Sequence, residues 1–181
     1  GAGGAFTAEK IPTSPPFGMF ASVYDCEDAE PTVWTSLTGM LPPQYQNLND
    51  GDSLDVTAFS INLEMLAGID ASLDAIGEEL SAQEAGAMVG WVFDSEGNPI
   101  AGATVSCGDD CGPFYYFDQD PSDGLFSTGM DVNATTDASG MLIMLAPPTA
   151  NYQAAADGYE FDGFLFGGNP GFATFAAFYA K

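Results

Sequence analysis

The residues in this sequence best suited to chemistry are carboxylates that gather in short acidic loops. In the stretch "DQDPSDG", Asp118, Asp120 and Asp123 precede Gly124, and Ser122 lies among them. This is a stretched form of the Asp-rich loops that hold calcium through side-chain and backbone oxygens. It lacks the frame of roughly twelve residues closed by a bidentate glutamate, so a solvated acidic turn explains the same residues.

A second acidic stretch, "NDGDSLD", carries the same kind of ligands at looser spacing. Its oxygen-bearing side chains are those of Asn49, Asp50, Asp52 and Asp55. Calcium prefers hard oxygen ligands of this kind, and it is the one cofactor that the sequence suggests. A turn exposed to solvent is again the alternative interpretation, and no organic cofactor is expected.

The three cysteines favour a disulfide over a metal site. Cys107 and Cys111 are separated by Gly-Asp-Asp, and the chain has no histidine to complete a zinc site. A bend at residues 108–110 can bring the two Cα atoms within the roughly 4.4–6.8 Å that a disulfide requires. We therefore predict a Cys107–Cys111 disulfide, which leaves Cys26 free or paired elsewhere.

One triplet, Asn133-Ala134-Thr135, is a sequon for N-glycosylation. Such triplets arise often by chance, so Asn133 is a candidate site only where the source glycosylates its secreted proteins.

The scarcity of basic residues excludes several classes of function. The chain has 26 acidic residues, two lysines (Lys10 and Lys181), and neither histidine nor arginine. Nucleic-acid binding needs basic residues to neutralise phosphates, and the same shortage disfavours phosphorylated ligands and anionic membranes. Catalytic triads and most zinc hydrolases need an imidazole. A glycosidase-like carboxylate pair is the catalytic set that remains, but it needs a deep cleft in a small chain, so we do not expect an enzyme.

The composition nevertheless indicates a folded and exported chain. Hydrophobic residues make up 46% of the 181 residues, which separates the chain from acidic disordered proteins despite its net charge of −24. No run of about 18 apolar residues predicts a membrane span. The sequence begins at Gly1 rather than methionine, as a mature product would after removal of a signal sequence, or as a trimmed chain would. We expect a protein that is secreted or lies at the cell surface.

The N-terminal half is predicted to contain an extended segment and then a β-rich region with one helix. Residues 1–16 combine a Gly/Ala tail with three prolines, and strand-like stretches follow at residues 17–24, 32–40 and 56–62. Over residues 63–80 the apolar positions recur at steps of three and four, which indicates an amphipathic helix. Its apolar face comprises Leu63, Leu66, Ile69, Leu73, Ile76 and Leu80.

Residues 89–181 are predicted to form a second unit, built from short strands separated by turns. In "WVFDSEGNPIAGATVSC" a turn at Gly97-Asn98-Pro99 separates two strands, and a further turn is expected at Ala138-Ser139-Gly140. Several short strands at this spacing indicate an antiparallel β-sandwich. We therefore expect a mostly β fold with domain boundaries after residues 16 and 88, the part over residues 17–88 being the smaller.

Three blocks of this second unit carry a family resemblance. They are Val89-Gly90-Trp91-Val92 with Gly97-Asn98-Pro99 and residues 101–105, then residues 135–142, and finally residues 151–154 with Asp157-Gly158-Tyr159. Over residues 89–160 they resemble the carboxypeptidase regulatory-like domains, which are transthyretin-like, Ig-like β-sandwiches. The resemblance implies a fold and says little about function, because such modules serve as spacers, adhesin segments and fibre subunits.

Two segments near the ends of the sequence are candidate contacts between copies of the chain. The run "GFATFAAFYAK" is predicted to be extended, and it forms either the last core strand or an interface strand between subunits. Its aromatic residues are Phe172, Phe175, Phe178 and Tyr179. The first residues are mostly small, so their backbone can lie close in a groove on a neighbouring copy; they are Gly1, Ala2, Gly3, Gly4, Ala5 and Phe6.

These expectations lead to one functional hypothesis and one rival. We predict a secreted, non-catalytic structural protein whose copies assemble into an extracellular fibre, sheath or surface layer, without a nucleic-acid partner or membrane insertion. Calcium held by clustered carboxylates would offset the repulsion between chains of charge −24. The rival is a monomeric calcium-dependent carbohydrate-binding or adhesion module, which would present an exposed aromatic platform beside an acidic loop.

Overall fold

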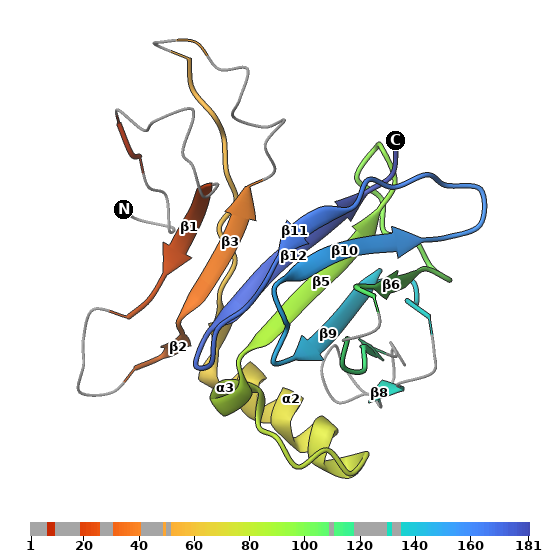
Figure 1. Cartoon of the computed structure of the whole chain (residues 1–181). Helices are drawn as coiled ribbons and strands as arrows, with labels where there is room; N and C mark the ends of the chain where they lie inside the picture. The colour runs from red at the N-terminus through yellow and green to blue at the C-terminus, as the bar shows by residue number, and fades with distance from the viewer. Residues whose placement is uncertain are drawn as a thin grey trace.

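The computed structural model describes residues 7–9, 19–25, 31–40, 49, 52–108, 111–117, 130–131 and 135–181. Over these residues the chain is mostly β, as the sequence predicts, with helices α2 (Leu63–Ala75) and α3 (Ala82–Ala85) at one end of a large sheet (Figure 1). The strands are β1 (Met19–Val23), β2 (Val33–Trp34), β3 (Ser36–Met40), β4 (Ile61–Asn62), β5 (Ala87–Phe93), β6 (Thr104–Ser106), β7 (Tyr115–Phe117), β8 (Met130–Asp131), β9 (Met141–Leu145), β10 (Ala150–Ala155), β11 (Phe164–Phe166) and β12 (Ala173–Tyr179).

The largest sheet has the strand order β1-β3-β12-β5-β9-β7-β8. Strand β12 lies between β3 and β5 and runs parallel to both, whereas the other neighbouring strands are antiparallel. The sheet is therefore mixed, which corrects the expectation of a purely antiparallel arrangement. The reason is the path of the chain, which leaves this sheet after β9 to form β10 and β11 and then returns in the direction of β5.

Both faces of the middle of the large sheet are covered. On one face, Leu66 and Ile69 of helix α2 pack with Val89 of β5 in a core that also includes residues of β2 and β4. On the other face lies a three-stranded sheet with the order β11-β10-β6, and its Tyr152 packs with Met88 in a second core. Because successive side chains of a strand point to opposite faces, the central strands contribute to both cores. Strand β9, "MLIML", is accordingly buried at every position.

The two halves of the sequence share the large sheet. Strand β5 begins at Ala87 and therefore crosses the boundary that we expected after residue 88. Strand β12 pairs with β5 over Ala173–Tyr179 and with β3 over residues 173–175. Segments on both sides of the expected boundary are thus hydrogen-bonded into one sheet.

Helix α2 is shorter than the periodicity predicts. It begins after Asn62, whose side-chain oxygen accepts a hydrogen bond from the backbone N–H of Met65 at 2.7 Å, and it ends at Ala75 instead of residue 80. Gly77 has a φ of 87°, a left-handed conformation that commonly ends helices. Ile76 and Leu80 consequently fall outside the helix and are 41% and 52% exposed, so the expected apolar face is wrong at these two positions.

The turn after β5 is built on Asp94. One carboxylate oxygen of Asp94 accepts hydrogen bonds from the backbone N–H groups of Glu96 and Asn98, and the other accepts from the Asn98 side chain. These bonds, the one from the Asn98 side chain first, hold the pKa of Asp94 below its usual value. Beyond a single bridge between Phe93 and Pro99 the chain diverges, and β6 joins the three-stranded sheet. The two strands that flank this turn therefore lie in different sheets and do not form a hairpin, although the turn between them lies where predicted.

Two glycines of the predicted turns have similar backbone conformations and different surroundings. Gly140 has a φ of 67°, and a Cβ there would lie 2.6 Å from the carbonyl oxygen of Val92 and 3.1 Å from Cβ of Pro99. Gly97 has a φ of 86°, and a Cβ there would have no neighbour within 4 Å. Substitutions at the two positions can therefore distinguish the energetic cost of backbone strain from that of a steric collision.

We predict that Gly140→Ala lowers the free energy of unfolding by about 2–5 kcal/mol, because a collision is added to the cost of a positive φ. Gly97→Ala is the matched control and should cost only about 1–2 kcal/mol, the backbone part alone. Urea denaturation followed by circular dichroism measures both values. Equal losses for the two variants would contradict the close packing described around Gly140.

Candidate functional site

The predicted calcium ligands fall partly within the described residues. Oδ2 of Asp52 accepts hydrogen bonds from the backbone nitrogen of Asn49 at 2.7 Å and from its side-chain nitrogen at 3.2 Å, which closes a local turn. Asp55 is exposed. Within the described ranges, no group of three or more His, Cys, Asp or Glu residues is arranged to hold a metal. The remaining predicted ligands lie outside the described residues; they are Asp50, Asp118, Asp120 and Asp123.

Cys107 and Cys111 form a disulfide in the structure, with their Cα atoms 5.5 Å apart. The bend between them includes Gly108, which has a φ of 89°, and the backbone N–H of Cys111 donates to the carbonyl oxygen of Gly108. Cys107 is buried in the core beneath the three-stranded sheet, so the disulfide fastens a loop to that core. Cys26 and the sequon residue Asn133 lie outside the described residues.

The aromatic C-terminal run is mainly a core strand. Phe175 belongs to the core under helix α2, and Phe178 to the core under the three-stranded sheet; they are 4% and 1% exposed. The expectation that these two residues contact another copy is therefore corrected, because the chain buries them itself. Phe172 is half-buried and Tyr179 is 47% exposed, so only these two keep accessible surface. Gly1–Phe6, the other expected interface, lies outside the described residues.

An uncharged pair of strands lies at one lateral edge of the large sheet, as far as the structure describes it. It consists of β1 and β3, an antiparallel pair that we call the neutral ribbon (Figure 1). No residue in 11–24 or 31–49 is charged, although the chain contains 26 acidic residues. In the described part of the chain, β1 has a hydrogen-bonded neighbour on one side only. Phe20 on this strand and Tyr24, which directly follows it, are 64% and 60% exposed.

Aromatic side chains form a second partly exposed surface, which we call the aromatic strip: Phe59, Trp91, Phe93 and Tyr179. The ring centroids of Phe59 and Trp91 are 5.1 Å apart, and those of Phe93 and Tyr179 are 5.4 Å apart and stacked. The buried ring of Phe175 contacts both Phe59 and Trp91. Trp91 and Phe93 are two residues apart on β5, so their side chains point to the same face of the sheet. The strip is therefore a continuation of the helix-side core into solvent.

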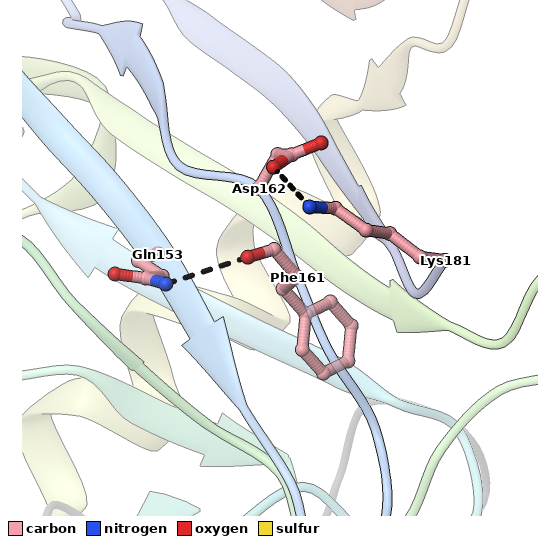
Figure 2. Close-up of polar contacts among 4 residues, drawn as sticks. All are labelled: Gln153, Phe161, Asp162 and Lys181. Atoms are coloured by element: carbon pink, nitrogen blue, oxygen red, sulfur yellow. Dashed lines mark hydrogen bonds and ion pairs between the residues drawn. The ribbon is translucent and has the colours of Figure 1, made fainter.

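One of the two lysine side chains already forms an ion pair. Nζ of Lys181 lies 2.7 Å from a carboxylate oxygen of Asp162, and this hydrogen bond raises the pKa of the lysine (Figure 2). Close by, the side-chain amide of Gln153 donates to the carbonyl oxygen of Phe161 at 3.4 Å. The backbone N–H of Lys181 also donates to the carbonyl oxygen of Glu160. The two bonds of Lys181 attach the segment after β12 to the connection between β10 and β11, and the Gln153 bond attaches β10 to the same connection.

Two surface features were missed by reasoning from sequence alone. The neutral ribbon has a sequence signal, since two long charge-free runs stand out in so acidic a chain. That β1 becomes an edge strand cannot be seen in the sequence, because the order of strands depends on tertiary pairing. The aromatic strip has no local signal either, since Phe59, Trp91 and Tyr179 come from three distant segments.

Comparison with known proteins leaves the chain without a family assignment. No family model matches it, and no curated protein matches it. The resemblance of residues 89–160 to carboxypeptidase regulatory-like domains therefore stays a prediction. Over the residues that the structure describes, no helix is long and apolar enough to cross a bilayer.

A carboxylate and a phenol form one strongly perturbed pair. The hydroxyl of Tyr115 on β7 donates to a carboxylate oxygen of Glu78, which follows helix α2. Burial first, and then the bond to Glu78, raises the pKa of Tyr115 to about 12. The bond from Tyr115 first, and then one from the backbone N–H of Leu80, lowers the pKa of Glu78. The pair fastens the segment after the helix to the sheet.

We predict that Tyr115→Phe lowers the free energy of unfolding at pH 7 by about 1 kcal/mol through loss of this bond. Because the pKa of Glu78 is lower in the folded state, its contribution is complete above the ordinary value of 4.5 and is lost as the pH falls through the lowered value. The difference from wild type should therefore shrink towards pH 3. Urea denaturation at pH 7 and pH 3 measures it.

Tyr116→Phe is the matched control for this experiment. The Tyr116 hydroxyl accepts a hydrogen bond from the backbone N–H of Val105, and that donor does not titrate. The loss caused by Tyr116→Phe should be the same at both pH values. A loss for Tyr115→Phe that is equally independent of pH would contradict the role given to Glu78.

Proposed function

We propose that the chain is a secreted, non-catalytic structural protein whose copies assemble into an extracellular fibre, sheath or surface layer. The observation that carries this proposal is the neutral ribbon at the end of the large sheet. An edge strand offers unpaired backbone groups to another strand, and soluble proteins usually protect such an edge with charges, proline or a bulge. The segment Met19–Val23 contains no charged residue and no proline.

The charge of the chain restricts where copies can meet. Each chain carries −24, so two copies repel wherever carboxylates face each other. Charge-free surface is therefore the natural place for contact, and the neutral ribbon supplies it. The perturbed acids support a structural role as well, because Asp94 and Glu78 engage in a turn and in a bond between elements. The Cys107–Cys111 disulfide suits an oxidising, extracellular setting.

We also propose that the packed sheets are a transthyretin-like sandwich. The three-stranded sheet covers β5, β9 and β12 through one continuous core, as the second layer of a sandwich would. Turns at Asp94 and at Gly140 lie in the blocks that carry the family resemblance. Such a module is a common building unit of surface proteins, which is compatible with assembly.

The proposal predicts that association increases with ionic strength. Charge interactions reach about 30 Å at 0.01 M salt and about 8 Å at 0.15 M, so repulsion between copies weakens as salt is added. We expect sedimentation velocity to show larger species at the higher salt and in calcium, and a shift to smaller species when a chelator is added at low salt. Sodium chloride at matched ionic strength separates calcium binding from screening. A well-ordered monomer at high concentration under all these conditions would overturn the proposal.

A second candidate function is supported by the aromatic strip. Exposed aromatic rings suit the apolar faces of sugars, and a neutral ligand meets no repulsion from an acidic chain. Phe59 and Tyr179 are 42% and 47% exposed, so their rings remain accessible in a single chain. This candidate is a monomeric carbohydrate-binding module, in which calcium would support the acidic loops.

The carbohydrate candidate predicts that neutral polysaccharides retard the wild-type chain in affinity electrophoresis. Tyr179→Ala should weaken the affinity behind that retardation roughly fivefold, since an aromatic contact contributes on the order of 1 kcal/mol. Leu165→Ala is the control, because Leu165 is 74% exposed on β11 and lies outside the strip. Absence of retardation for wild type with every neutral polysaccharide would exclude this candidate.

A further inference from the structure

The outer edge of β1 is the surface from which the contact between copies can be inferred. We propose that it binds β1 of a second copy, antiparallel, about a two-fold axis at Ala21, so that the two large sheets become one. This inference rests on the proposed function, and it names the residues that join the copies. The joint places Phe20 opposite Ser22 of the partner subunit and Ala21 opposite its own equivalent.

The burial of β1 fits a strand that has one neighbour, β3, among the described residues. Along Met19–Val23 the residues alternate between half-buried and exposed, and none is buried. By contrast, β5 and β9 in the middle of the sheet are almost entirely buried. Pairing on the outer side would hydrogen-bond backbone groups that have no strand partner among the described residues, and it would cover Phe20, whose side chain is 64% exposed.

The charges next to β1 favour a second copy in the antiparallel direction. Residues 11–24 are uncharged, whereas acids occur at 25, 27, 28 and 30. Asp25 is held at this end of the ribbon, where its carboxylate accepts hydrogen bonds from the backbone N–H and the hydroxyl of Thr32. Parallel pairing would set the two acidic stretches side by side. Antiparallel pairing about Ala21 sets them at opposite ends of the joint, each beside an uncharged stretch of the other copy.

The register also matches large side chains with small ones. Phe20 and Ser22 face the same side of β1, since they are two residues apart. In the antiparallel register each Phe20 ring lies over the Ser22 of the partner, which leaves room for it. This register also avoids like charges directly opposite each other, which is the cross-strand arrangement that destabilises a sheet. A two-fold contact of this kind is also the commonest symmetry in homo-oligomers.

A two-fold joint closes on itself, so β1 alone produces a dimer. A fibre or layer then needs a further contact elsewhere on the chain. The dimer is therefore the repeating unit that this joint predicts for the assembly, and dilution should release dimers before monomers.

The experiment exchanges the charges across the joint. One variant carries Phe20→Glu and Ser22→Glu, and the other carries Phe20→Lys and Ser22→Lys; both positions are exposed, so the fold of the single chain should persist. Alone, each variant sets like charges opposite each other and should lose association about tenfold or more relative to wild type. An equimolar mixture sets glutamates opposite lysines and should regain association as a heterodimer. Sedimentation velocity with one variant fluorescently labelled measures all samples.

The control places the same charges on another strand pair. Ala155 and Leu165 are exposed on β10 and β11, and their double substitution to Glu or to Lys changes the net charge equally. These control variants should associate as wild type does. Circular dichroism and thermal melting check that each variant is folded, and rescue by mixing cannot occur if a variant is unfolded.

Each outcome is decisive. If wild type does not associate, the proposed function is wrong and the joint falls with it. If wild type and the β1 variants associate equally, assembly stands and the joint is wrong. If both β1 variants lose association and the mixture does not regain it, another segment pairs with β1, and the inference of a β1–β1 contact is overturned. Recovery in the mixture alone, with unaffected controls, supports it.

Discussion

Strand β12 joins the N-terminal ribbon to the rest of the large sheet, because it is hydrogen-bonded to β3 on one side and to β5 on the other. Its pairing with β5 extends over Ala173–Tyr179, and its pairing with β3 connects the N-terminal ribbon to the rest of the sheet. Phe175 and Phe178 on this strand point to opposite faces and enter both cores. The ribbon, the helix-side core and the three-stranded sheet all depend on this one strand. Without β12, β3 would have no described neighbour on that side, and each core would lose a buried phenylalanine.

The sequence predicts the local elements far better than their arrangement. The mostly β character, the helix start at Leu63 and the turns at Gly97 and Gly140 are local properties of turn and cap residues. The predicted end of the helix lies too far along the chain. Apolar residues continue at helical spacing beyond Gly77, although the backbone there is no longer helical. The extended character of the C-terminal run was predicted, but its central place could not be. A strand buried on both faces is a continuous apolar run, and such a run carries no information about its neighbours.

The candidate sites also differ in whether local sequence or contacts between distant segments determine them. The disulfide depends on two cysteines four residues apart, so chain geometry alone is enough to suggest it. The predicted interface residues Phe175 and Phe178 were misjudged, because apolar character alone does not distinguish a core strand from an interface strand. The edge position of β1 and the aromatic strip arise from contacts between distant segments. Asn49 and Asp52 are close in sequence, and the structure uses them for a turn.

The distribution of charge gives this acidic chain two kinds of surface. Carboxylates occupy turns, as Asp94 and Asp52 do, and the two helices, while the strands of the neutral ribbon and the segment from residue 163 to residue 180 carry none. Acidic surface keeps copies apart at long range, and uncharged surface permits contact only in certain orientations. High net charge and specific self-association are therefore compatible in one molecule. The relative orientation of two associating copies is then determined by the surfaces that lack charge.

The central position of β12 also determines when the sheet can form during synthesis. Residues 173–179 leave the ribosome after all the other strands described here, yet they lie between β3 and β5. Until they emerge, the N-terminal ribbon and the β5–β9 pair are separate pieces, each with an open edge that another chain could occupy. A nascent chain interrupted before residue 173 would keep both edges open. Emergence of residues 173–179 is thus the event that allows the sheet to close.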